Sequence, residues 1–104
     1  MIVDERSYYF YPGKHAEFLK LYETEGMAIQ VPILERMVGY FTVEVGELNC
    51  VVHMWGYDDL GDMEGKRAKL MSDPKWLQYV PKIRPLMLRQ ETRLLKPTAW
   101  SPIR

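Results

Sequence analysis

Apolar and polar side chains alternate most regularly over residues 39–59, and this pattern predicts two antiparallel strands joined by a short turn. The turn falls at residues 46–49, which begin with glycine and end with asparagine. The expected register sets Phe41 opposite Met54 and Tyr40 opposite Trp55. One face of this hairpin is wholly apolar, and we expect helices to cover it. The other face is rich in aromatic groups and needs a partner or a ligand; its residues include Tyr40, Thr42, Glu44, Val51, His53, Trp55 and Tyr57.

Two further strands are predicted near the ends of the chain. Residues 2–11 alternate without a plainly solvated side and end at Pro12-Gly13, which is a turn signal. Residues 87–95 form the last predicted strand, and residues 96–104 follow as a proline-rich tail.

A first helix is predicted over residues 14–30, where apolar side chains recur at the spacing of one helical stripe. Gly26 is expected to weaken its second half by about 1 kcal/mol relative to alanine. Because proline cannot donate a backbone hydrogen bond, Pro32 predicts an irregular or restarted helix over residues 31–38.

The second helical region begins at Asp58-Asp59, which can cap a helix, and restarts at Asp73-Pro74. The restart combines an N-cap aspartate with proline at the first helical position. We expect Pro81 to kink or divide the last helix and Pro85 to end it.

The order strand, helix, strand, strand, helix, strand predicts an α+β fold, a ferredoxin-like βαββαβ antiparallel sheet with helices on one face. Residues 1–104 form a single domain, with a core over 1–95 and a C-terminal tail over 96–104. The uncovered face carries large apolar groups, and exposure of that kind marks an interface. We therefore expect a homodimer through the sheet face.

Composition excludes several classes of function. Lysine plus arginine number 14 and aspartate plus glutamate number 14, so no net charge draws the protein to nucleic acid or to a membrane surface. The single cysteine, Cys50, cannot form an intrachain disulfide, and on the apolar hairpin face it predicts an inert buried thiol. No secretory leader or membrane span is visible, so a cytoplasmic protein is expected.

His53 is the first candidate for chemistry, because a histidine in mid-strand among aromatic residues could act as a general base or bind a metal. The alternative is a core histidine that hydrogen-bonds to a threonine or tyrosine hydroxyl. No second histidine or acidic pair stands at ligand spacing, so no metal site and no cofactor are predicted.

Three arginines on the outer strands form the second candidate group. Arg6 lies in the middle of the first strand, and Arg89 and Arg93 share one face of the last. They could hold a carboxylate, enolate or carbonyl group, or they could form an ion-pair network with nearby acidic residues. Aromatic residues could line a pocket, or they could simply belong to the core or to an interface; the candidates are Tyr8, Tyr9, Tyr11, Tyr40, Trp55, Tyr57, Trp76 and Tyr79.

A series of short motifs in this order resembles the NIPSNAP family over nearly the whole chain. The residues that carry the resemblance are Asp4-x-Arg6-x-Tyr8, Pro12-Gly13-Lys14, Val38-Gly39-Tyr40-Phe41, Leu48-Asn49-x-Val51-Val52-His53-x-Trp55-x-Tyr57-Asp58-Asp59-Leu60, Arg67, Asp73-Pro74-x-Trp76, Gln90-Glu91-x-Arg93 and Lys96-Pro97-Thr98. The resemblance implies a dimeric α/β-barrel of the compact bacterial type, in which two ferredoxin-like units pair sheet to sheet. Glu5 and Thr92 depart from the family pattern, which has an apolar residue and an asparagine there.

The resemblance leaves two hypotheses for function. The wider dimeric α/β-barrel superfamily includes cofactor-free monooxygenases, haem-degrading enzymes, dehydratases and lactone isomerases, which implies a small metabolite bound or converted in a pocket beside the sheet. In that case His53 serves as base or hydrogen-bond donor, Arg6 and Arg93 hold an anion, and Tyr8, Tyr40 and Trp55 form walls. The alternative is a non-catalytic dimeric module for protein interaction or scaffolding. Haem binding through His53 is a remote third option.

Overall fold

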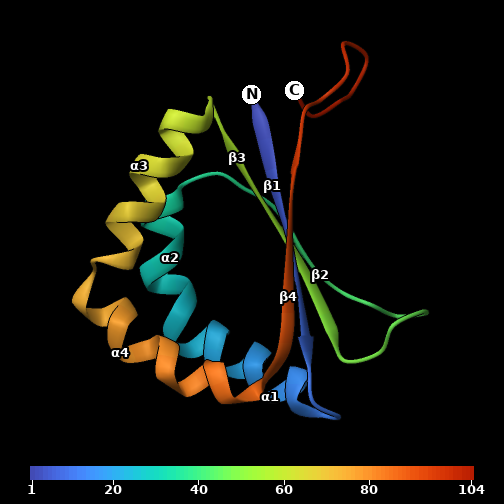
Figure 1. The fold of residues 1–104 in the computed structure, drawn as a ribbon, viewed down its shortest axis with the longest axis vertical. Coiled ribbons are helices and arrows are strands. Elements are labelled where there is room, and N and C mark those ends of the chain that lie inside the picture. The colour runs from blue at the N-terminus through green and yellow to red at the C-terminus, as the bar shows by residue number, and fades with distance from the viewer.

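The computed structural model describes the whole chain, residues 1–104, and contains one four-stranded antiparallel sheet with its helices on one side (Figure 1). The strands are β1 (Ile2–Phe10), β2 (Met37–Thr42), β3 (Cys50–Tyr57) and β4 (Met87–Leu95). Their order across the sheet is β2-β3-β1-β4, which is the arrangement of a ferredoxin-like fold. The predicted α+β fold class is confirmed.

The first helical segment runs longer than predicted and contains an irregular turn. It consists of α1 (Lys14–Leu21), the π-helical turn η1 (Tyr22–Gly26) and α2 (Met27–Leu34). The expectation of an interruption at Pro32 is wrong. Pro32 and Ala28, the residue whose carbonyl group would otherwise accept a hydrogen bond from position 32, are both exposed, while the fully buried Leu34 holds the last turn in place.

The second helical region begins where the aspartates predicted. Asp59 caps α3 (Leu60–Met71) by accepting a hydrogen bond from the Asp62 backbone N–H at 2.8 Å. Asp73 caps α4 (Pro74–Ile83) by accepting from two backbone N–H groups at 2.9 and 3.0 Å. Pro81 lies inside α4 without dividing it, because it too faces solvent. The turn η2 (Arg84–Leu86) leads into β4.

The helices cover the aromatic face of the hairpin, so the expectation that they would cover the apolar face is wrong. His53, Trp55 and Tyr57 are buried beneath the helices, whereas Phe41 on the opposite face is 53% exposed. The large aromatic side chains bury more area than the smaller apolar ones, which favours this choice. The uncovered face also carries Val52, Met54 and the buried Cys50.

The register of the hairpin also differs from the prediction. Tyr40 lies opposite His53 and Phe41 opposite Val52, because β2 ends at Thr42 and a longer connection replaces the short turn. The difference amounts to two residues, which preserves the division of side chains between the two faces. None of the helices has the length and apolar character needed to cross a membrane.

Candidate functional site

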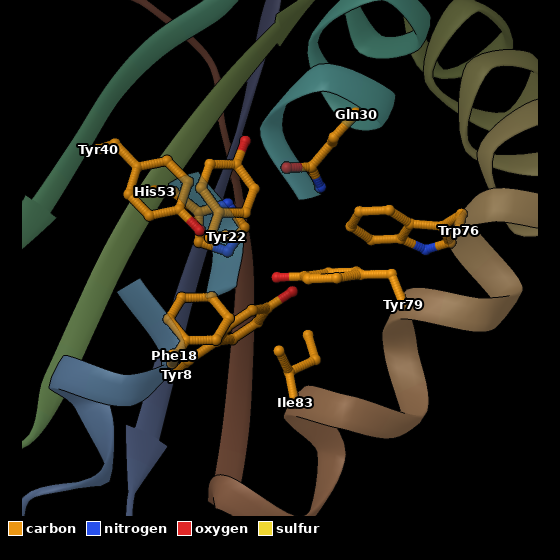
Figure 2. A pocket seen from close by; sticks show the side chains of 9 residues that line it. All are labelled: Tyr8, Phe18, Tyr22, Gln30, Tyr40, His53, Trp76, Tyr79 and Ile83. Atoms are coloured by element: carbon orange, nitrogen blue, oxygen red, sulfur yellow. The ribbon is translucent and has the colours of Figure 1, made fainter. Parts of the chain in front are cut away.

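Side chains from the sheet and from the helices enclose a small cavity that contains room for one water-sized group. Its volume is about 10 Å³, close to the minimum for one water molecule. Side chains of β1, β2 and β3 line it on the sheet side, and side chains of the first helical segment and α4 line it on the helix side (Figure 2). The lining residues are Tyr8, Phe18, Tyr22, Gln30, Tyr40, His53, Trp76, Tyr79 and Ile83.

The position of the proton on His53 follows from its neighbour on β3. The Trp55 indole Nε1–H donates a hydrogen bond to His53 Nδ1 at 2.8 Å. An indole nitrogen can only donate, so Nδ1 must be the unprotonated nitrogen, and a neutral ring then carries its proton on Nε2. This Nε2–H is buried and has no hydrogen-bond partner. His53 is therefore a fixed donor at the cavity.

Aromatic rings hold the imidazole on both sides. Tyr40 stacks on it with ring centroids 4.8 Å apart, and Tyr8 meets it edge-on at 4.6 Å. Burial, together with the positive charges of Arg6 and Arg67, lowers the pKa of His53 to about 3. The ring is thus neutral near pH 7, and of the two roles that the sequence suggested, base or hydrogen-bond donor, its geometry suits the donor.

Four buried polar atoms without hydrogen-bond partners belong to residues that line the cavity. They are Tyr22 Oη, Gln30 Oε1, His53 Nε2 and Tyr79 Oη. Burial raises the pKa values of Tyr22 and Tyr79, so both hydroxyls stay protonated and can donate. The cavity therefore offers three donors and one amide acceptor to a single small group, and a ligand oxygen or a water molecule satisfies that set.

A larger pocket of about 130 Å³ lies next to the cavity, between β1, β4 and helices α3 and α4. We call it the arginine vestibule, because its polar lining includes Arg6, Arg67 and Arg84. It shares Tyr8, Trp76 and Ile83 with the cavity, so the two spaces adjoin at these three side chains. Its remaining lining residues are Met71, Val80, Met87 and Gln90.

Arg6 is fixed in the vestibule by the only acidic group on its face of β1. Its Nε lies 3.0 Å from Asp4 Oδ2, and the Asp4 side chain is fully buried. Burial acts to lower the pKa of Arg6, but Tyr8 and Asp4 outweigh it, and the pKa rises. The arginine stays charged in a partly buried position.

The structure brings most of the predicted site residues together but separates the outer arginines. Arg6, Tyr8, Tyr40 and His53 line the two spaces, and Trp55 lies behind His53. Arg93 lies on the opposite face of the sheet, where its Nε donates to Glu5 at 2.8 Å. Arg89 lies on that face too, over the Tyr9 ring and paired with Glu91. For these two, the ion-pair alternative describes the structure.

Sequence reasoning missed part of the helical half of the site. Trp76 and Tyr79 were among the aromatic candidates for a pocket, whereas Tyr22 and Ile83 occupied apolar stripes and looked like ordinary core residues. Arg67 fell on the apolar side of α3, and a charge in that position was the one available signal. Gln30 gave no signal, because a polar residue near the end of a helix is usually exposed, whereas this one is 4% exposed.

Comparison with known proteins gives a consistent family match. A family model described as NIPSNAP matches residues 3–102. A NIPSNAP family protein from Agrobacterium tumefaciens, known from its crystal structure, is 46% identical in sequence to this chain. The match covers 99% of this chain and 98% of that protein's chain, with a TM-score of 0.97. A NIPSNAP-like domain protein from Burkholderia xenovorans is 47% identical over 97% of this chain and 88% of its own, with a TM-score of 0.95.

Curated relatives are longer proteins. The human protein NipSnap homolog 3A is 32% identical over 98 residues, which are 91% of this chain and 38% of the human protein. The chain therefore spans less than half the length of that relative. An antibiotic biosynthesis monooxygenase of known structure shares only 15% identity over 94% of this chain and 99% of its own, with a TM-score of 0.62, and shows likeness of fold alone.

Proposed function

The chain belongs to the NIPSNAP family, and on that premise we propose that it binds a small carbonyl-bearing metabolite beside the sheet. The carbonyl oxygen would occupy the cavity at His53. The observation that carries this proposal is the gathering of four buried polar atoms without partners on one enclosed space.

Buried polar atoms without hydrogen-bond partners lower the stability of the folded protein. Leaving one buried donor or acceptor without a partner costs about 1–3 kcal/mol. Four of them around a space for one small group indicate that an occupant supplies the missing hydrogen bonds. A water molecule can do so in the free protein, and a ligand oxygen can replace it at little cost because it accepts from the same donors.

The donor set also suggests what happens to the bound molecule. Neutral donors aimed at an oxygen stabilise negative charge that develops there, and one donor of this kind is typically worth about 10²–10³ in rate. An enolate formed from a carbonyl compound places its charge on that oxygen. These donors would polarise the bound carbonyl group and make its α-proton more acidic, with His53 Nε2–H donating to the oxygen throughout. An antibiotic biosynthesis monooxygenase has a similar fold, so the fold is one that can carry an enzyme of that class.

The test is a ligand-observed NMR screen of small molecules with and without a carbonyl group, run on the unmodified protein and on two variants. His53→Phe keeps a ring of similar size and removes the donor. His15→Phe makes the same change outside the cavity and is the matched control. We expect carbonyl compounds to bind the protein and the His15 variant, and to lose binding in the His53 variant. A folded His53→Phe protein with unchanged binding would refute the proposal.

We also propose that the protein acts as a homodimer through the uncovered sheet face. Phe41, Val52 and Met54 lie together there without a helical cover, and the domain is small enough to gain from association. Light scattering should give a dimer mass, and Phe41→Asp should shift it towards the monomer. A dimer that binds no small molecule would leave the interaction or scaffolding module as the better description.

A further inference from the structure

We propose that the ligand is a small oxo- or hydroxycarboxylate whose acid group binds in the arginine vestibule. This inference rests on the proposed function, and it adds the charge and the size of the molecule. The vestibule lies against the cavity, so one compact ligand can place its carboxylate among the arginines and its second oxygen beside His53.

Two of the three arginines of the vestibule, Arg67 and Arg84, have no acidic partner. Four of the seven arginines form salt bridges, namely Arg6, Arg36, Arg89 and Arg93. Of the other three, Arg67 and Arg84 line the same pocket, and Arg104 belongs to the tail. Two guanidinium groups without counter-charges in one pocket indicate an anionic partner that the protein does not itself supply.

The balance of charge inside the vestibule points the same way. The lining of the vestibule contains Arg6, Arg67 and Arg84 but no acidic residue, and only Arg6 pairs with an aspartate, Asp4. Apolar side chains fill most of the remaining wall, and charges interact more strongly when such groups exclude water. Burial is the main cause of the lowered pKa of His53, and the charges of Arg6 and Arg67 add to it, in agreement with positive charge beside the cavity.

The dimensions of the two spaces limit the ligand. A volume of about 130 Å³ is well below the roughly 300–1,000 Å³ of pockets for drug-sized molecules. The cavity beyond it admits one oxygen-sized group. A guanidinium fork matches a planar carboxylate with two parallel hydrogen bonds. These limits together describe an acid with a second oxygen, carbonyl or hydroxyl, on a short carbon chain.

The experiment measures dissociation constants at pH 7 for three matched probe sets: small oxo- and hydroxycarboxylates, their uncharged amides, and phosphate monoesters of similar size. Each set is tested on the unmodified protein, on Arg67→Met, on Arg84→Met and on Arg104→Met. We expect the carboxylates to bind at least about tenfold more tightly than the amides, and to lose about tenfold in each vestibule variant. Arg104→Met, which removes the same charge from the tail, should bind as the unmodified protein does.

The outcomes separate this inference from the proposed function. Amides that bind as well as carboxylates, with no effect of the vestibule variants, would overturn the anionic ligand and leave the proposed function intact. Phosphate esters that bind more tightly than carboxylates would overturn the acid class. If no probe binds and the His53 variant behaves like the unmodified protein, both fail. Should Arg67→Met fold poorly by circular dichroism, the exposed Arg84 carries the test alone.

Discussion

Lowering the pH should destabilise the protein through His53, because the buried imidazole takes up a proton far less readily than the unfolded chain does. The folded pKa of His53 is about 3, against an ordinary value of about 6.5. Above pH 6.5 the ring is neutral in both states and makes no contribution. Below that pH, His53 binds a proton in the unfolded state but not in the folded state. Stability therefore falls as the pH is lowered, until the pH reaches the folded pKa.

The magnitude can be worked out for pH 5, which lies about 1.5 pH units below the ordinary pKa of histidine. Each pH unit in this window costs about 1.4 kcal/mol, so the folded state should lose about 2 kcal/mol through this one ring between pH 7.5 and pH 5. That loss is a large fraction of the 5–15 kcal/mol that holds a typical domain together.

The assay is urea unfolding at pH 7.5 and pH 5, with the change in unfolding free energy compared between the unmodified protein and His53→Phe. The unmodified protein should lose about 2 kcal/mol more than the variant, because the carboxylates contribute equally to both. His15→Phe should retain the full loss. Nitrogen NMR of the imidazole gives a direct check. A His53 ring that titrates near pH 6.5, or that carries its proton on Nδ1, would refute the reasoning.

Three further predictions concern single side chains. Gly26→Ala places a methyl carbon 2.6 Å from Tyr79 Cζ. The overpacking cost of about 1–3 kcal/mol should exceed the helix-propensity gain of about 1 kcal/mol, so the variant should be less stable in urea unfolding. A more stable variant would contradict this. Asp73→Ala should lower the unfolding free energy by about 1 kcal/mol and the melting temperature by several degrees, because α4 loses its cap; an unchanged melting temperature would argue against it. Trp55→Phe should free the His53 tautomer, seen as mixed Nδ1–H and Nε2–H signals in nitrogen NMR, and a single Nε2–H signal would count against the fixed donor.

Periodicity was enough to predict the fold, because strands and helices repeat at different intervals along the chain. The bounds of β4 and the capping aspartates of α3 and α4 agree with the structure. Helices that pass through Pro32 and Pro81 could not be predicted. Whether a proline breaks a helix depends on whether the freed carbonyl faces water, and that is a property of the packed molecule.

The site could be predicted mainly on its strand side. His53 and Tyr40 share a face because residues two apart on a strand, and partners across it, obey a simple alternation. Which face of the sheet the helices cover depends on how complete side chains pack together. Gly26 illustrates the limit: in sequence it is a weak helix residue, and in the structure its missing side chain admits the Tyr79 ring.

The pairing of β1 with β4 has a consequence for how the chain folds as it is made. Val3 lies opposite Leu95, so residues 3–95 are enclosed in one loop. Closing a loop of that length costs chain entropy. Topologies of high contact order therefore fold more slowly than helical bundles. Until β4 leaves the ribosome, one edge of β1 has unpaired backbone N–H and C=O groups that can pair with another strand. During synthesis the nascent chain is therefore more prone to aggregate than the finished molecule, whose outermost strand there bears Arg89, Glu91 and Arg93.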